Sequence, residues 1–539
     1  MSIVLAVLLL LPTCGVALPQ HAHDAPEGNA AITLMSGLGD LHHEVSTNSE
    51  GAQRFFDQGL ALVYALNYPD ARRSFQRAAE LDPQMAMAYW GLALAGGPNI
   101  NQDIDAEGER EPCEAVQQAL ALSGRASESE RLYIKALAKR YSTEPQADLK
   151  QLAIDYKDAM GAAAQLLPDD PDAATLYAES LMNLRPWKLW TVDGKPAEGT
   201  EEIMSVLESV LRRHPNHLGA NHDYIHAVEA SPHPEWGLPS AERLRALNLC
   251  AAAAHLVHMP SHIYLRIGDY EAAARSNEAA LALHPGNQAS SGHARHCLNF
   301  LVTAYSMQGR FGAARAATAQ LESLVNPSLR RRAGTGAVVS ASVWLLVRFR
   351  RWDDILKSTE PHRGLLDTNT FWRWARAMAY AWTGKPAEAE AERTLFIKEV
   401  NAIPADALIG LNSEREVFQL ADYVLSARIA HAEGGRKAAL DTLRKAVATE
   451  DALAYSEPPD WCMPARETLG GLLLLYSDYV EAEKIFRADL LRNPRNGRSL
   501  FGLVKSLEGQ GKNHAAALVR IEFESAWGGA DTQLKVEEL

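Results

Sequence analysis

Residues 59–83 read GLALVYALNYPDARRSFQRAAELDP, and the order of small and aromatic residues in this stretch decides the fold. Small and aromatic side chains follow one another at fixed intervals and a proline closes the stretch, at positions Gly59, Tyr68, Ala71, Phe75, Ala78 and Pro83. Small residues let two helices approach closely, and aromatic rings fill the space between them. The stretch therefore predicts two helices joined by a short turn.

The same spacing recurs along the chain. A second unit begins near Ala86 and carries Trp90-Gly91. The spacing returns near the other end at Gly470, Tyr479, Ala482, Phe486 and Pro494, in part at Leu500, Gly511 and Ala516, and further joints lie at Gly309, Ala313 and Ala314 and from Gly384 to Ala389. It resembles the tetratricopeptide (TPR) pattern of about 34 residues, and no stretch alternates with the period of two that a half-buried strand requires. We expect an all-α solenoid of TPR-type helix-turn-helix units.

Length and charge limit the range of possible functions. A chain of 539 residues exceeds what one globular core usually supports, which fits a repeat array whose core grows with length. Apolar residues make up 47% and charged residues 22%, as in ordinary folded proteins. The net charge of −14 argues against binding to nucleic acid or to an anionic membrane.

The N-terminus predicts export. Residues 1–17 form an apolar run that ends in small residues and is too short to span a membrane, although the usual basic residue before the run is missing. Residues 18–46 are polar and predict a flexible segment that becomes ordered near its end. The widely spaced Cys113, Cys250, Cys297 and Cys462 form no CxxC pair and indicate no disulfide framework. We expect a periplasmic or extracellular protein.

Histidines concentrate in the middle of the chain, where 11 of the 18 lie within residues 214–296. Residues 221–229 read NHDYIHAVE and residues 255–262 read HLVHMPSH. If both segments are helical, each places its ligand-type side chains within roughly 60° of arc. These side chains are His222, His226 and Glu229 in the first segment and His255, His258 and His262 in the second.

The repeat register brings the two histidine segments together. With Gly268 as the turn, the helix of the second segment runs from about residue 254 to residue 267. In TPR proteins such positions face the concave groove, so the resemblance implies that both stripes face one cavity from neighbouring helices. A third unit adds His296 and Asn299. The predicted metal ligands are His222, His226, Glu229, His255, His258, His262 and His296.

A proline interrupts the second histidine segment. Inside a helix Pro260 removes one backbone hydrogen bond and frees the carbonyl of Leu256, at a cost of about 3 kcal/mol unless another contact compensates. We predict a kink beside the ligand stripe, and a kink at this place is better explained by function than by packing.

Further motifs make the resemblance to TPR proteins more specific. They are GPNIN at residues 97–101, YIHAVEAS at 224–231, HLVHMPSHIY at 255–264, PAR at 464–466 and LFGL at 500–503. Over about residues 37–531 the chain resembles a large group of exported bacterial TPR proteins with HxxxHxxE and HxxHMPSHIY motifs. The resemblance implies a helical solenoid with a metal site, but no settled reaction. Asp223 stands where the group usually has Tyr, and HCLNF at residues 296–300 departs from its HNxHF, which puts the third ligand strip in doubt.

Two functions of different classes fit these features. In the first, the groove holds a transition metal (copper, iron or zinc), Glu229 or Asp223 moves protons, and Arg266 orients an anionic small molecule, as in a metal-dependent oxidoreductase or hydrolase. In the second, the protein is an exported scaffold that binds a peptide or partner, and the histidines form a structural network. We favour the first, because a scaffold needs no such density of ligands.

The chain divides into five predicted segments. They are a signal peptide (1–17), a flexible segment (18–46), N-terminal TPR-like helices (47–185), a central histidine-rich region that holds the metal site (186–310) and C-terminal TPR helices (311–539).

Overall fold

The computed structural model describes residues 32–105, 107–144, 146–283, 292–324, 341–360 and 366–539. The predicted signal peptide and the first part of the segment that follows it lie outside these residues. Within them, the chain forms helices almost throughout, and consecutive helices pack against each other as antiparallel pairs. The prediction of an all-α solenoid is confirmed.

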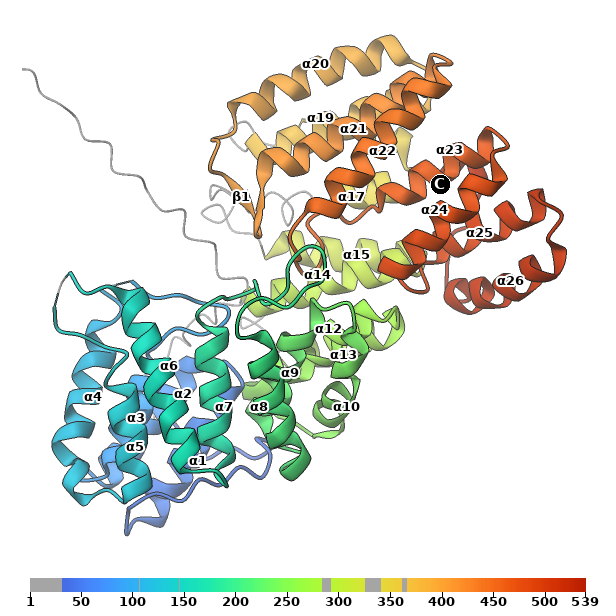
Figure 1. Ribbon diagram of the computed structural model, residues 1–539. Helices are drawn as coiled ribbons and strands as arrows, with labels where there is room; N and C mark the ends of the chain where they lie inside the picture. Colours follow the sequence, from blue (N-terminus) through green and yellow to red (C-terminus); the bar gives the residue numbers. More distant parts are fainter. Residues whose placement is uncertain (1–31, 106, 145, 284–291, 325–340, 361–365) are drawn as a thin grey trace, which may run out of the picture.

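The N-terminal helices form the part drawn from blue to green in Figure 1. They are α1 (Glu50–Tyr64), α2 (Tyr68–Leu81), α3 (Ala86–Leu94), α4 (Arg110–Leu122), η1 (Ser123–Arg125), α5 (Glu128–Leu137), α6 (Leu149–Leu166), α7 (Pro171–Met182), α8 (Thr200–Arg213) and α9 (Leu218–Glu229). Residues 183–199, between α7 and α8, are irregular apart from a single bridge between Trp190 and Pro196.

Two phenylalanines show why the small residues of the repeat are needed. A Cβ atom added to Gly59 would lie 2.7 Å from the ring of Phe75, and one added to Gly91 would lie 2.3 Å from the same ring. The ring therefore fills the space between α1 and α3. Phe486 lies in the same way between Gly470 and Gly502, where added Cβ atoms would come within 2.5 and 2.2 Å. The repeat inferred from the sequence thus has the same packing at both ends of the chain.

The helices that carry the candidate site follow α9. They are η2 (Pro234–Gly237), α10 (Leu238–Ala246), η3 (Ala251–Ala253), α11 (Ala254–His258), α12 (Pro260–Arg266), α13 (Tyr270–Ala282) and α14 (Gly292–Met307). Gly268 and Gly309 end α12 and α14 with backbone φ angles of 78° and 72°, a region that favours glycine. Both are the joints that the repeat pattern predicts.

The C-terminal helices form the part drawn from yellow-green to red in Figure 1. They are α15 (Phe311–Ser323), α17 (Ala341–Arg348), α18 (Trp352–Lys357), α19 (Leu366–Trp382), α20 (Pro386–Ala402), α21 (Glu414–Ala432), α22 (Arg436–Ala452), α23 (Ala465–Leu475), α24 (Tyr479–Arg492), α25 (Gly497–Gly509), α26 (Asn513–Trp527) and η6 (Val536–Glu538). A short hairpin of β1 (Leu408–Ile409) and β2 (Asn412–Ser413) precedes α21.

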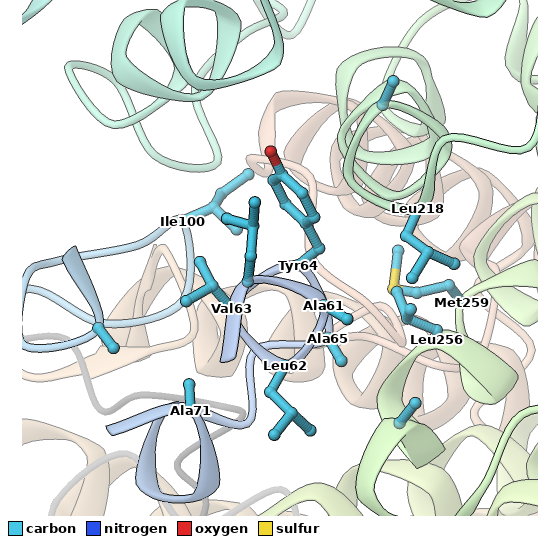
Figure 2. Close-up of a cluster of buried hydrophobic side chains, with 14 of the residues drawn as sticks. Ala61, Leu62, Val63, Tyr64, Ala65, Ala71, Ile100, Leu218, Leu256 and Met259 are labelled. Carbon is cyan, nitrogen blue, oxygen red and sulfur yellow. The ribbon is translucent and has the colours of Figure 1, made fainter. Parts of the chain in front are cut away.

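Three hydrophobic cores follow one another along the chain. The first extends from Ile32 to Leu345, the second from Trp344 to Ala465 and the third from Ala427 to Leu539. In the first core, the last turn of α1 packs against Leu218, Leu256 and Met259 (Figure 2), so α1 supports both histidine segments. None of the described helices is long and apolar enough to cross a membrane.

The described part of the N-terminal segment is packed rather than free. Its Ile32, Leu38 and Val45 belong to the first core. His43 Nδ1 lies 2.8 Å from Asp172 Oδ2 on α7. The segment is therefore ordered from its first described residue, earlier than the sequence suggests, because apolar side chains and an ion pair hold it.

Candidate metal site

Helix α9 is buried along its whole length, and its start is fixed by His217. His217 Nδ1 accepts the amide hydrogen of Ala220 at 3.0 Å, so its Nε2 carries the proton and donates to Asp172 at 3.0 Å. An added Cβ at Gly219 would lie 2.4 Å from the ring of Tyr64, which shows how closely α9 approaches α1. These contacts fix the direction in which His222 points.

The helix of the second histidine segment is interrupted immediately before Pro260. Helix α11 ends at His258 and α12 starts at Pro260, with Met259 between them in helical conformation. The amide of His262 bonds to the carbonyl of Met259 at 3.2 Å, three residues back. The histidines of α11 and α12 both face α9: the ring centroids of His255 and His222 lie 4.9 Å apart, and those of His262 and His226 lie 5.4 Å apart.

Helix α14 supplies the third strip of the site. The ring of His296 lies 4.7 Å from that of His258 and 5.8 Å from that of His262, so the departure from HNxHF does not remove this histidine from the site. His293, which the sequence analysis did not single out, lies 5.5 Å from the ring of His258. Asn299 is half-buried and lies instead in a separate small cavity beside Trp344, Pro458 and Cys462.

Three groups of side chains could each hold a metal ion. In each, the candidate ligand atoms lie within 4.8 Å of one another: His222, His226 and His255; His258, His262 and His296; and His226, Glu229 and His262. The predicted metal ligands are thus all brought together. Their residues are between 0% and 6% exposed. The resemblance implies that they face a concave groove, and the structure places them in the interior.

Glu229 connects the groups. Its Oε1 accepts a hydrogen bond from His226 Nδ1 at 2.7 Å, and its Oε2 accepts from His262 Nδ1 at 2.8 Å and from the Tyr455 hydroxyl at 2.8 Å. Both histidines therefore use Nδ1 for the carboxylate, which leaves Nε2 for a metal ion. His226 Nε2 is buried and has no hydrogen-bond partner among the described residues.

His258 is oriented by an amide instead of a carboxylate. Asn277 Nδ2 donates to the carbonyl of Ala273 at 2.8 Å, which fixes the amide so that its Oδ1 faces His258 Nδ1 at 2.7 Å. Because an amide oxygen only accepts, Nδ1 of His258 carries the proton. Its Nε2 then offers a lone pair toward His262 Nε2, 2.8 Å away.

Two close pairs of ring nitrogens have the spacing of metal ligands. His258 Nε2 and His262 Nε2 lie 2.8 Å apart, and His255 Nε2 and His222 Nε2 lie 3.0 Å apart. Two nitrogens that bind one ion at about 2.0 to 2.1 Å would lie about 2.9 Å apart at the 90° angle of square-planar or octahedral coordination, and about 3.3 to 3.4 Å apart at the tetrahedral angle. The chemistry and spacing of these donors therefore fit a transition-metal ion.

Two further site residues come from the C-terminal half. Tyr455 and Glu457 lie in the segment between α22 and α23, and Glu457 forms an ion pair with His262 while Tyr455 binds Glu229. Sequence reasoning missed both, because they are more than 190 residues away from the histidine segments and belong to no periodic pattern. This segment contacts the site at Glu229 and His262, which are both buried.

Burial and charge set the protonation of the site. Burial lowers the pKa of His222, His226 and His258, so these rings are neutral. Burial alone would also lower the pKa of His262, but the charges of Glu457 and Glu229 raise it to about 10. Burial alone would raise the pKa of Glu229, but His262 holds it well below its usual range.

In the metal-free site His262 is therefore an imidazolium, and it donates to the Glu229 carboxylate through Nδ1. Burial and the nearby charge of Glu229 raise the pKa of Glu457, and the charge of His262 opposes this rise. In this state Nε2 of the imidazolium donates to His258 Nε2. A metal ion that bound here would displace this proton.

Asp223 and Arg266 occupy the margins of the site. Asp223 Oδ1 lies 3.7 Å from His222 Nδ1, too far for a hydrogen bond, and its pKa is raised by burial and by Glu179. Arg266 Nε donates to the carbonyl of Glu229 at 2.9 Å, and its guanidinium lies 5.5 Å from the centre of the Tyr455 ring. Arg266 thus holds the end of α9 and Tyr455, and these contacts give no support to a role in orienting a substrate.

A second histidine and carboxylate group lies away from the site. His43, Asp170 and Asp172 place their ligand atoms within 4.8 Å. Asp172, however, already accepts hydrogen bonds from His43, His217 and the Tyr64 hydroxyl. A carboxylate with its acceptors occupied in this way joins the N-terminal segment to α1, α7 and α9, and we regard the group as structural.

No protein-family model and no curated protein matches the chain. Among solved structures, it is similar to human IFIT1 in the dimer with m7Gppp-AAAA (12% identity, 89% of this chain and 91% of that chain, TM-score 0.33) and to yeast Tom70 (13%, 87% and 96%, TM-score 0.33). It is also similar to the APC/C hetero-tetramer Cut9–Hcn1 (12%, 89% and 78%, TM-score 0.31). The description of the fold rests on the repeat spacing and on the helix pairs themselves.

Proposed function

We propose that the buried cluster is a transition-metal centre, and that the protein is an exported helical solenoid that uses this centre for oxidative or hydrolytic chemistry on a small molecule. The observation that carries the proposal is the orientation of the rings. His226, His258 and His262 each bind an oxygen acceptor through Nδ1, and their Nε2 atoms remain for an ion.

The donor set limits the ion and the chemistry. Neutral imidazoles with one nearby carboxylate suit copper, iron or zinc, and such an ion would supply Lewis-acid or redox chemistry. The residues of the chain have their own roles. Glu229 orients His226 and His262, and the Tyr455 hydroxyl donates a third hydrogen bond to the same carboxylate. Glu457 contributes a second acidic group beside His262.

A second candidate is an interaction scaffold in which a metal ion or the hydrogen-bond network only stabilises the fold. The burial of the histidines favours this candidate, because the segment with Tyr455 and Glu457 covers them. The two candidates differ in whether the ion has an open coordination position.

Elemental analysis tests the metal centre. The untagged protein, produced with its own N-terminus, should retain transition metal, and His226→Ala and His258→Ala should each lower both the metal content and the melting temperature. The proposal would be contradicted if the wild type contained no metal and lost no stability in a chelator. It would also be contradicted if the variant that carries both His226→Ala and His258→Ala kept the full metal content.

Binding of a small anion then separates catalyst from scaffold. Azide added to the copper-loaded or iron-loaded protein should change its absorption spectrum if a coordination position is open. If the spectrum does not change at a high azide concentration, and removal of the metal lowers the melting temperature, the ion has a structural role.

A further inference from the structure

The histidines of the site divide into two groups that share no residue. One group has two members on α9 and one on α11, and the other has members on α11, α12 and α14: they are His222, His226 and His255, and His258, His262 and His296. Each group has three imidazoles, the number of protein ligands that catalytic zinc sites often use beside an open position. No single helix supplies all three histidines of either group.

Each group contains its own close pair of nitrogens. The pair in the first group is 3.0 Å apart and the pair in the second is 2.8 Å apart, each close to the spacing of two ligands on one ion. Ring centroids do not separate the groups, since those of His226 and His262 lie 5.4 Å apart across the groups and those of His226 and His255 lie 6.5 Å apart within the first. The ligand atoms do separate them: among the described residues, no set of ligand atoms that all lie within 4.8 Å of one another contains both nitrogen pairs. One ion placed at either pair would leave the other pair unused.

Glu229 lies between the two groups and binds one histidine from each. It accepts from His226 in the first group and from His262 in the second, both through Nδ1. The same carboxylate thus fixes the ring orientation in both groups and places a negative charge between two positions that would each hold a cation.

We propose that each three-histidine group binds its own transition-metal ion, which makes the site dinuclear, with Glu229 joining the two positions through His226 and His262. This inference rests on the metal centre proposed above. It goes beyond that proposal because it assigns the second group of histidines to a second ion.

Metal stoichiometry of the full-length protein tests the inference. The metal-free protein would be titrated with cobalt(II), followed by its absorption and by elemental analysis after gel filtration. We expect two equivalents in the wild type and one in His222→Ala, which removes a ligand from the first group, and one in His296→Ala, which removes a ligand from the second. His233→Ala is the matched control, because His233 is exposed and lies outside both groups.

The outcomes separate this inference from the proposed function. One equivalent in the wild type that both variants abolish would overturn the dinuclear site and keep the metal centre. No bound cobalt in the wild type would overturn both. A variant that keeps two equivalents would show that its histidine is not a ligand and would overturn the assignment of its group; circular dichroism of each variant would establish that it is folded.

Discussion

Replacement of Glu229 by Gln is the most direct test of how the histidine rings of the site are oriented. The carboxylate accepts three hydrogen bonds, at 2.7, 2.8 and 2.8 Å, from His226, His262 and Tyr455. Gln keeps one oxygen, and if this oxygen faces His262 and Tyr455, its NH2 group faces the protonated Nδ1 of His226. His226 must then move its proton to Nε2, the nitrogen that would bind metal.

The expected magnitude follows from these contacts. Loss of at least one hydrogen bond to a charged group should lower the free energy of unfolding of the metal-free protein by about 1.5 to 3 kcal/mol. Loss of an orienting carboxylate typically weakens metal affinity about 10- to 100-fold, or about 1.4 to 2.7 kcal/mol. Glu229→Gln should therefore still bind metal, but more weakly, and any turnover should fall sharply.

Competition with a coloured chelator measures the metal affinity, and urea unfolding of the metal-free protein measures the stability. Glu235→Gln is the matched control, because Glu235 pairs with His233 at 3.0 Å on the surface, where both side chains are more than half exposed. The reasoning about ring orientation would be refuted if Glu229→Gln matched the wild type in both measurements.

Three further changes test other contacts. Tyr455→Phe removes one donor to the central carboxylate but keeps the ring, so metal-free stability should fall by about 1 to 3 kcal/mol in urea unfolding, and unchanged stability would contradict this. The pKa of His43 is raised above its usual value of about 6.5 by Asp172, although burial opposes this. The stabilisation by this pair is therefore fully present below about pH 6.5 and is lost as the pH rises through the raised pKa, so the difference between wild type and His43→Ala should shrink on that rise. Gly91→Ala would place a Cβ atom 2.3 Å from the Phe75 ring, and overpacking should cost about 1 to 3 kcal/mol of unfolding free energy.

The repeat could be predicted from the sequence because its signal is local. Small residues at Gly59 and Gly91 and an aromatic residue at Phe75 have to follow one another at set distances for helices to pack, and the structure has this packing. The histidine stripes were predicted for the same reason, since helical periodicity places residues three and four apart on one face. Pro260 likewise begins a new helix, α12, within the second histidine segment.

The contacts that close the site could not be predicted in this way. Tyr455 and Glu457 reach the histidines only through the arrangement of the C-terminal half, and the stretch that carries them has neither helical spacing nor a ligand motif. The same long-range contact packs against Glu229 and His262. A pattern within one segment identifies the side chains that share a helix face, but not the distant segment that covers that face.

The segment with Tyr455 and Glu457 also affects the charge and orientation of the ligands before an ion binds. Protonated imidazoles would repel a metal cation, and burial keeps His222, His226 and His258 neutral. The protonated ring of His262 is balanced by Glu229, which accepts a hydrogen bond from Tyr455 of the C-terminal half. His226, His258 and His262 are therefore oriented without metal, and an ion that bound to them would displace protons. Because Tyr455 and Glu457 belong to the C-terminal half and the histidines to the N-terminal core, occupancy of the site should stabilise the contact between these two parts of the solenoid.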